Sequence, residues 1–89
     1  MNVANPTSQS TELRIKPAGS GGGADGWHVL GPNGTYSIIL PANSMWQVES
    51  RLLGSQLISS IQAPSDAEIE LVLSGARIRP QLLRQPIEV

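Results

Sequence analysis

The sequence predicts an all-β fold, a small single-domain antiparallel β-sandwich or barrel of about seven short strands with extended termini. Three observations indicate this fold. Apolar and polar residues alternate along several short segments, turn-forming Gly, Pro, Asn and Ser residues separate these segments, and folding neighbouring segments into hairpins brings their apolar residues opposite one another. The chain shows no internal repeat with a period of roughly 20 to 50 residues, so a solenoid is not expected.

The composition indicates a thin core. The chain of 89 residues has room for one domain, and 39% of its residues are hydrophobic but only 3% are aromatic. It contains no cysteine, so neither a disulfide nor a thiolate zinc site can add stability. Small domains with little core and no disulfide or metal site often gain stability by forming oligomers or by docking on a larger partner. We therefore expect a homo-oligomer or a docked subunit.

The charge balance argues against nucleic acid as a partner. Lys and Arg number 6 against 7 Asp and Glu, and Arg77, Arg79 and Arg84 have glutamates among them rather than forming a basic patch. No apolar run approaches the roughly 18 residues of a membrane span, and no basic-then-apolar signal peptide follows the first methionine. We expect neither nucleic acid nor membrane as a partner, and a cytoplasmic location unless the protein is part of a virion.

The domain organisation follows from shifts in composition. Residues 1–11 are polar without periodicity and predict an extended N-terminal arm outside the core. The β-sandwich domain spans 12–80, starting with a half-buried strand at 12–16 that is followed by a glycine-rich loop at 17–26. Prolines flank and interrupt residues 81–89, which predict an extended tail or an edge strand.

A first hairpin is predicted around the sequence GPNG at 31–34. Proline at the second turn position and Asn-Gly after it suit a type I turn followed by a left-handed glycine. The flanking segments 27–30 and 35–40 then pair, with Leu30 opposite Thr35. This register gives two faces, the first with Trp27, Val29, Tyr36 and Ile38, and the second with His28 and Ser37.

Residues 45–53 fit either a helix or a strand. For a helix, Ser44 and Gln47 form a capping box and Gly54 lies at the C-terminal position. For a strand, a two-residue turn at Gly54–Ser55 brings every inward apolar residue opposite another one. The pairs are Leu52 with Leu57, Val48 with Ile61, and Trp46 with Ala63. This match favours the strand.

The alternation in EIELVLSGARIRP, residues 68–80, predicts another hairpin. With Ser74–Gly75 as the turn, Glu70 lies across from Arg79 on the outer face, a pair worth roughly 0.2–1 kcal/mol. The inward pairs of this register are Leu73 with Ala76, Leu71 with Ile78, and Ile69 with Pro80.

No residue set in the sequence indicates catalysis, a cofactor or a metal. His28 is the only histidine, and Asp25 precedes it by three residues, so a Ser-His-Asp triad is conceivable. However, no serine stands in a GxSxG nucleophile motif. One histidine without cysteine does not make a typical zinc site. The run GSGGGADG lacks the Lys-Ser/Thr ending and the following helix of a phosphate loop. We therefore expect a protein that is not an enzyme and that has no cofactor.

The sequence GTYSIILPANSMWQV, residues 34–48, resembles the joint between strands in small β-sandwich modules of phage virions. In these capsid decoration (cement) and fibre proteins, a strand ending in Pro-Ala is followed by a strand that carries Trp and Val. The resemblance implies a virion protein that sits as a homo-oligomer, a trimer being favoured, on a lattice such as a major capsid protein and fastens it with extended arms. It thereby implies partner-binding residues in both arms, Asn2, Val3, Asn5, Pro6, Leu82, Leu83 and Ile87.

Two other functions remain open from the residues. A carbohydrate- or receptor-binding module would use Trp27, His28 and Tyr36 beside the glycine-rich loop, and Trp27 is the better of the two tryptophans for a surface role. An oligonucleotide-binding barrel would use Trp46 with Arg77 and Arg79. Because aromatic residues are few, both tryptophans are otherwise expected in the core.

Overall fold

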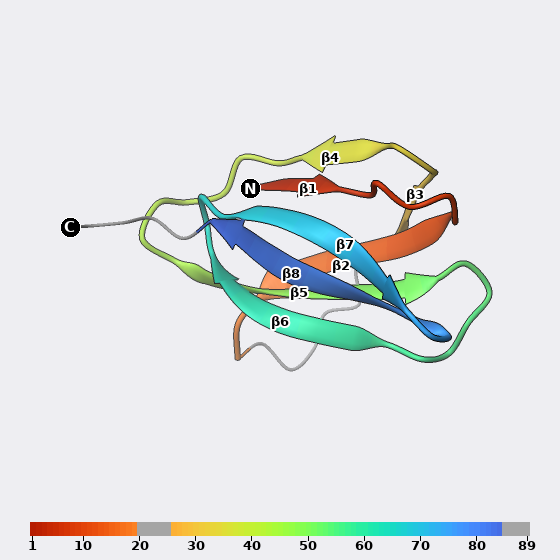
Figure 1. Cartoon of the computed structure of the whole chain (residues 1–89). Helices are drawn as coiled ribbons and strands as arrows, with labels where there is room; N and C mark the ends of the chain where they lie inside the picture. Colours follow the sequence, from red (N-terminus) through yellow and green to blue (C-terminus); the bar gives the residue numbers. More distant parts are fainter. Residues whose placement is uncertain (20–25, 85–89) are drawn as a thin grey trace.

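The computed structural model describes residues 1–19 and 26–84, and it forms a β-sandwich of two four-stranded sheets (Figure 1). One sheet has the strand order β4-β1-β7-β8 and the other has the order β3-β2-β5-β6. The described residues include no helix, so the predicted all-β sandwich is confirmed. The strands are β1 (Asn2–Ala4), β2 (Thr11–Pro17), β3 (His28–Leu30), β4 (Thr35–Ser37), β5 (Met45–Leu52), β6 (Ser59–Pro64), β7 (Glu68–Ser74) and β8 (Arg77–Arg84).

The core lies between the two sheets and is built from small aliphatic side chains. Leu13 of β2 and Val48 of β5 are fully buried on the inner face of one sheet, and Leu71 of β7 and Ile78 of β8 on that of the other. Trp46, Tyr36 and the aliphatic side chains Ile15, Ile38, Leu40, Leu52, Ile61 and Leu82 pack around this centre and are half-buried. The period-two alternation of the sequence therefore places one apolar face of each long strand inside.

The N-terminal residues lie in a sheet rather than outside the core. β1 lies between β4, to which it is antiparallel, and β7, to which it is parallel. Met1 and Val3 are buried, and Asn5 and Thr11 are 0% exposed. The prediction of an arm outside the core is therefore wrong for these residues. A three-residue strand is too short to show periodicity, and its place between two other strands depends on contacts distant in sequence.

The predicted hairpin around 31–34 is wrong, although the turn itself is present. β3 pairs with β2 and β4 pairs with β1, so the GPNG turn carries the chain from one sheet to the other. The Gly34 amide donates to the Gly31 carbonyl at 3.0 Å, which closes the turn. The left-handed residue is Asn33, with φ 59°, and this position suits a type II turn rather than the predicted type I.

The β5–β6 hairpin confirms the strand interpretation of residues 45–53. Trp46 pairs with Ala63 and Val48 with Ile61, as predicted. The predicted pair of Leu52 with Leu57 is absent because the ladder ends at the pair of Ser50 with Ser59. The chain turns instead over Leu52–Ser55, where the Ser55 amide donates to the Leu52 carbonyl at 2.8 Å and Gly54 has φ 83°.

The β7–β8 hairpin exists, but its register differs from the predicted one by two residues. Its loop is Gly75–Ala76, flanked by the pair of Ser74 with Arg77. Gly75 has φ 62°, and a two-residue type II′ loop needs such a residue at its first position. A shift of two keeps every side chain on its predicted face. The pairs become Leu73 with Ile78, Leu71 with Pro80, Ile69 with Leu82, Val72 with Arg79 and Glu70 with Gln81, so the predicted pair of Glu70 with Arg79 is wrong.

Candidate functional site

The sandwich has two sides at which an edge strand of one sheet approaches an edge strand of the other, and one of them is closed. There β3 and β4 meet, and the ring of His28 stacks on that of Tyr36 with 5.1 Å between centroids and 27° between planes. His28 lies opposite Leu13 and Tyr36 opposite Val3, so both rings are on the inner faces of their sheets, at the rim of the sandwich, where His28 stays exposed and Tyr36 is half-buried. We call this side, with Asn5 and Thr11 beneath it, the closed edge.

Asn5 holds the closed edge together through its side chain. Its amide nitrogen donates to the carbonyl oxygens of Gln9 at 2.8 Å, Gly31 at 3.0 Å and Leu30 at 3.2 Å. Its amide oxygen accepts from the Thr7 hydroxyl at 2.6 Å. The Asn5 side chain thus connects the β1–β2 loop to the β3–β4 turn. Asn5 is predicted from sequence to bind a partner, but its side chain is fully used inside the protein.

The outer face of the β2–β5 pair carries an ion-pair ladder that Trp27 covers. Arg14 pairs with Glu49 at 2.6 Å and Arg51 with Glu12 at 2.8 Å, each across the two strands. The guanidinium carbons of Arg14 and Arg51 lie 4.5 and 4.1 Å from the Trp27 ring centroid, so each makes a cation–π contact. This ladder was not predicted from the sequence, although its signal is the alternation of charged residues in β2 and β5, with opposite signs at Glu12 and Arg51 and at Arg14 and Glu49.

The structure separates the residues of the predicted carbohydrate site. His28 and Tyr36 meet at the closed edge, whereas Trp27 lies on the outer face of the other sheet over two arginines. The glycine-rich loop is outside the described residues from 20 to 25. Trp46 does not form a stacking platform either, because it is half-buried against the core and donates its indole N–H to the Ser44 hydroxyl at 2.8 Å.

The opposite side of the sandwich, where β6 and β8 meet, is open and forms a groove of about 440 Å³. Ile61, Pro80 and Leu82 provide its apolar part. Arg79 is exposed and forms no ion pair with the described residues, and Arg77 beside it donates only to the Ile58 carbonyl, at 3.3 Å. We call this side the open edge. The groove is lined by Ser59, Ser60, Ile61, Gln62, Arg79, Pro80, Gln81 and Leu82.

The remaining predicted partner-binding residues are dispersed. Val3 is buried in the core, whereas Asn2 and Pro6 are exposed. Leu82 lines the groove, and Leu83 is 53% exposed at an irregularity of the β7–β8 ladder. Ile87 lies outside the described residues. Of the six predicted residues that the structure describes, only Leu82 therefore belongs to the open edge. Ser60, Gln62 and the edge position of Arg79 were not predicted from the sequence.

One end of the sandwich exposes several large apolar side chains. Leu53, Leu57 and Ile58 in the β5–β6 loop are 54%, 42% and 40% exposed, and Leu73 beside the β7–β8 turn is 42% exposed. Both loops lie at the same end in Figure 1, and the bond from Arg77 to the Ile58 carbonyl joins them. We call these four residues the apolar end.

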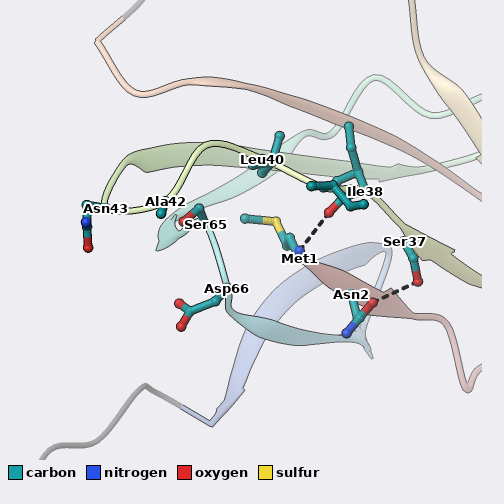
Figure 2. A pocket seen from close by; sticks show the side chains of 10 residues that line it. Met1, Asn2, Ser37, Ile38, Leu40, Ala42, Asn43, Ser65 and Asp66 are labelled. Atoms are coloured by element: carbon teal, nitrogen blue, oxygen red, sulfur yellow. Dashed lines mark hydrogen bonds between the residues drawn. The ribbon is translucent and has the colours of Figure 1, made fainter.

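A cavity of about 570 Å³ lies at the other end, between β1 and the β4–β5 and β6–β7 connections (Figure 2). The Met1 amine donates to the Ile38 carbonyl at 2.8 Å and the Ser37 hydroxyl to the Asn2 side chain at 2.7 Å. Among the described residues of the lining, Asp66 alone carries a carboxylate.

Within residues 1–19 and 26–84, no three His, Asp or Glu side chains are close enough to hold a metal ion, and no helix could cross a membrane. The chain matches no protein-family model, no curated protein and no solved structure.

Proposed function

We propose that the protein is a non-enzymatic structural module that forms a homo-oligomer and attaches to a larger protein assembly, such as the lattice of a phage capsid. The apolar end carries this proposal. Contiguous exposed apolar surface is rare on monomeric proteins and is typical of protein interfaces. Leu53, Leu57, Ile58 and Leu73 are 40% to 54% exposed, and the two loops that carry or adjoin them lie at the same end of the sandwich (Figure 1).

The mode of attachment differs from the one that the resemblance to virion modules implies. Fastening by a free N-terminal arm would require Val3 and Asn5 to leave the sheet, where they are buried. Contacts through the apolar end and through an edge strand require no such rearrangement. Several weak contacts that act together in an oligomer would bind a repeating lattice by avidity, and a trimer is the expected oligomer.

The proposal is tested by the mass of the protein in solution, measured by light scattering over a concentration series. We expect the wild type to reach a defined multiple of 9.4 kDa, and the double variant Leu53→Asp/Leu57→Asp to remain monomeric. Ile39→Asp is the matched control, because Ile39 is 98% exposed but lies in the β4–β5 connection at the other end. A monomeric wild type at every concentration, or an oligomer that the double variant keeps, would contradict the proposal.

A further inference from the structure

The hydrogen-bond pattern shows which backbone groups of β6 face outward at the open edge. In an antiparallel pair, residues that bond to the neighbouring strand alternate with residues that do not. The Ser65 amide donates to the Ser44 carbonyl at 3.0 Å, in the same register that pairs Ala63 with Trp46 and Ile61 with Val48. Ser59, Ile61 and Ala63 therefore bond to β5, and the N–H and C=O groups of Ser60 and Gln62 point away from the sheet.

The carbonyl groups on either side of these two residues, those of Ile58 and Pro64, already have partners. The Ile58 carbonyl accepts a hydrogen bond from the Arg77 side chain, and the Pro64 carbonyl accepts one from the Ala67 amide at 3.1 Å. Pro64 itself has no N–H, a common device for ending the exposed part of an edge strand. The free stretch of β6 is therefore limited to Ser60 and Gln62, enough for a short extended segment of a partner.

The other strand of the groove is less suited to pairing. In β8, the residues that face away from β7 alternate with Arg77 and Arg79, and they include Ile78 and Pro80. The Ile78 carbonyl accepts from the Ser50 hydroxyl at 3.0 Å, and Pro80 has no N–H. An incoming strand therefore finds its hydrogen-bonding partners on β6, while β8 forms the opposite wall of the groove.

The charge at the groove defines the chemistry of the occupant. Arg77 and Arg79 lie on one face of β8, two residues apart and so about 6.6 Å apart along the strand. Neither forms an ion pair with a described residue, and no described carboxylate lines the groove. Carboxylates at alternate positions of an extended peptide have the same spacing.

We infer that the open edge binds an extended acidic segment of a partner protein, which adds to β6 as an additional strand. This inference rests on the proposed assembly role and names the partner's chemistry. The segment bonds to the backbone of Ser60 and Gln62. It places carboxylates beside Arg77 and Arg79 and packs one apolar side chain over Ile61.

The test is a titration of ¹⁵N-labelled protein with the synthetic peptide Thr-Asp-Thr-Asp-Thr-Val-Thr, followed by NMR. We expect the amide signals of Ser60, Ile61 and Gln62 to shift in a saturable manner. The same peptide with Lys in place of Asp should bind at least about tenfold more weakly, since its charges repel the arginines. Equal binding of both peptides, or shifts confined to other strands, would overturn the inference.

Protein variants separate the contributions of charge and backbone. Arg79→Gln should weaken binding about tenfold, whereas Lys16→Gln, which removes the same charge from β2, should leave it unchanged. Gln62→Pro removes an outward N–H without removing a bond of the sheet and should abolish strand addition. If Arg79→Gln and Lys16→Gln weaken binding equally, the attraction is nonspecific and the inference fails.

The outcome is distinguishable from that of the proposed function. Leu53→Asp/Leu57→Asp, which is expected to prevent oligomerisation, should still bind the acidic peptide. The same shifts at Ser60 and Gln62 on raising the protein concentration without peptide would identify a second copy of the chain as the occupant, and would overturn the acidic partner.

Discussion

At the closed edge the Asn5 side chain bonds the carbonyl groups of three other residues, whereas at the open edge the backbone groups of Ser60 and Gln62 face outward with no strand beside them. The two sides belong to the same pair of sheets. At the first side, loops fold back over the edge strands and the Thr11 hydroxyl donates to the Leu30 carbonyl. At the second side, the bonds from Ser50 to the Ile78 carbonyl and from Arg77 to the Ile58 carbonyl connect the two sheets. Internal bonding on one side stabilises the fold and leaves the other side available for a partner.

The largest expected effect is that of removing the Asn5 side chain from the closed edge. Asn5→Ala removes three hydrogen bonds that a fully buried amide donates, although each of the three carbonyl groups keeps another donor, and it also removes the acceptor of the Thr7 hydroxyl. It should lower the free energy of unfolding by about 2–3 kcal/mol. Urea denaturation followed by circular dichroism measures this loss. Asn2→Ala is the control, since Asn2 is exposed and only accepts from the Ser37 hydroxyl. Equal losses of unfolding free energy for the two variants would contradict the claim that the Asn5 side chain holds the closed edge together.

The second effect concerns the ion-pair ladder under Trp27. Glu49 is 7% exposed and has Arg14 at 2.6 Å and Lys16 at 3.7 Å, so Glu49→Gln should cost about 1–2 kcal/mol after allowance for the exposure of the two cations. Thermal denaturation of the wild type and of Glu49→Gln at low and high salt measures this loss of stability and the share of it that salt screens. Glu70→Gln, a change on the outer face of the other sheet, should cost less than about 0.5 kcal/mol. A cost for Glu70→Gln as large as that for Glu49→Gln would show that the ladder adds nothing specific.

The third effect is the contribution of the ring pair that joins the two sheets. Tyr36→Leu keeps an apolar side chain but removes the stack with His28, and it should cost about 1 kcal/mol. A double-mutant cycle with His28→Ala measures the coupling, since each single variant also changes other contacts. Additive losses, with no coupling between the two positions, would show that the stack does not close the edge.

The smallest effect is expected at the open edge. Arg79→Gln should change the free energy of unfolding by less than about 0.5 kcal/mol, because Arg79 forms no ion pair with the described residues and is exposed. Equilibrium denaturation checks this value, and Arg14→Gln, which loses the bond to Glu49, is the control with a larger expected cost. A large loss for Arg79→Gln would mean that the arginine stabilises the fold.

The sequence was informative wherever the determining contacts are local. The β5–β6 pairing follows from the alternation around Val48 and Ile61, which meet across one hairpin. The β7–β8 register was missed by two residues because the alternation is the same in both registers, and the need for glycine at the first loop position decided between them. Turn geometry, rather than side-chain pattern, fixed that pairing.

Features that join distant parts of the chain could not be read in this way. β1 is a three-residue strand whose neighbours, β4 and β7, lie more than thirty residues away along the chain. The GPNG turn has the composition of a hairpin turn, but it connects two different sheets. As a result, the closed edge was not foreseen, and Asn5 was assigned to a partner surface rather than to the interior. The open edge was missed for the same reason, because it needs β6 and β8 to lie side by side.

Amide hydrogen exchange of the free protein tests most directly whether the two edges differ in this way. We predict that the amides of Ser60 and Gln62 exchange nearly as fast as in an unstructured peptide, while those of Ile61 and Ala63 are protected by β5. The acidic peptide should slow the exchange of Ser60 and Gln62 selectively. Protection of Ser60 and Gln62 equal to that of Ile61 and Ala63 in the free monomer would contradict this prediction, because the open edge would then already be paired.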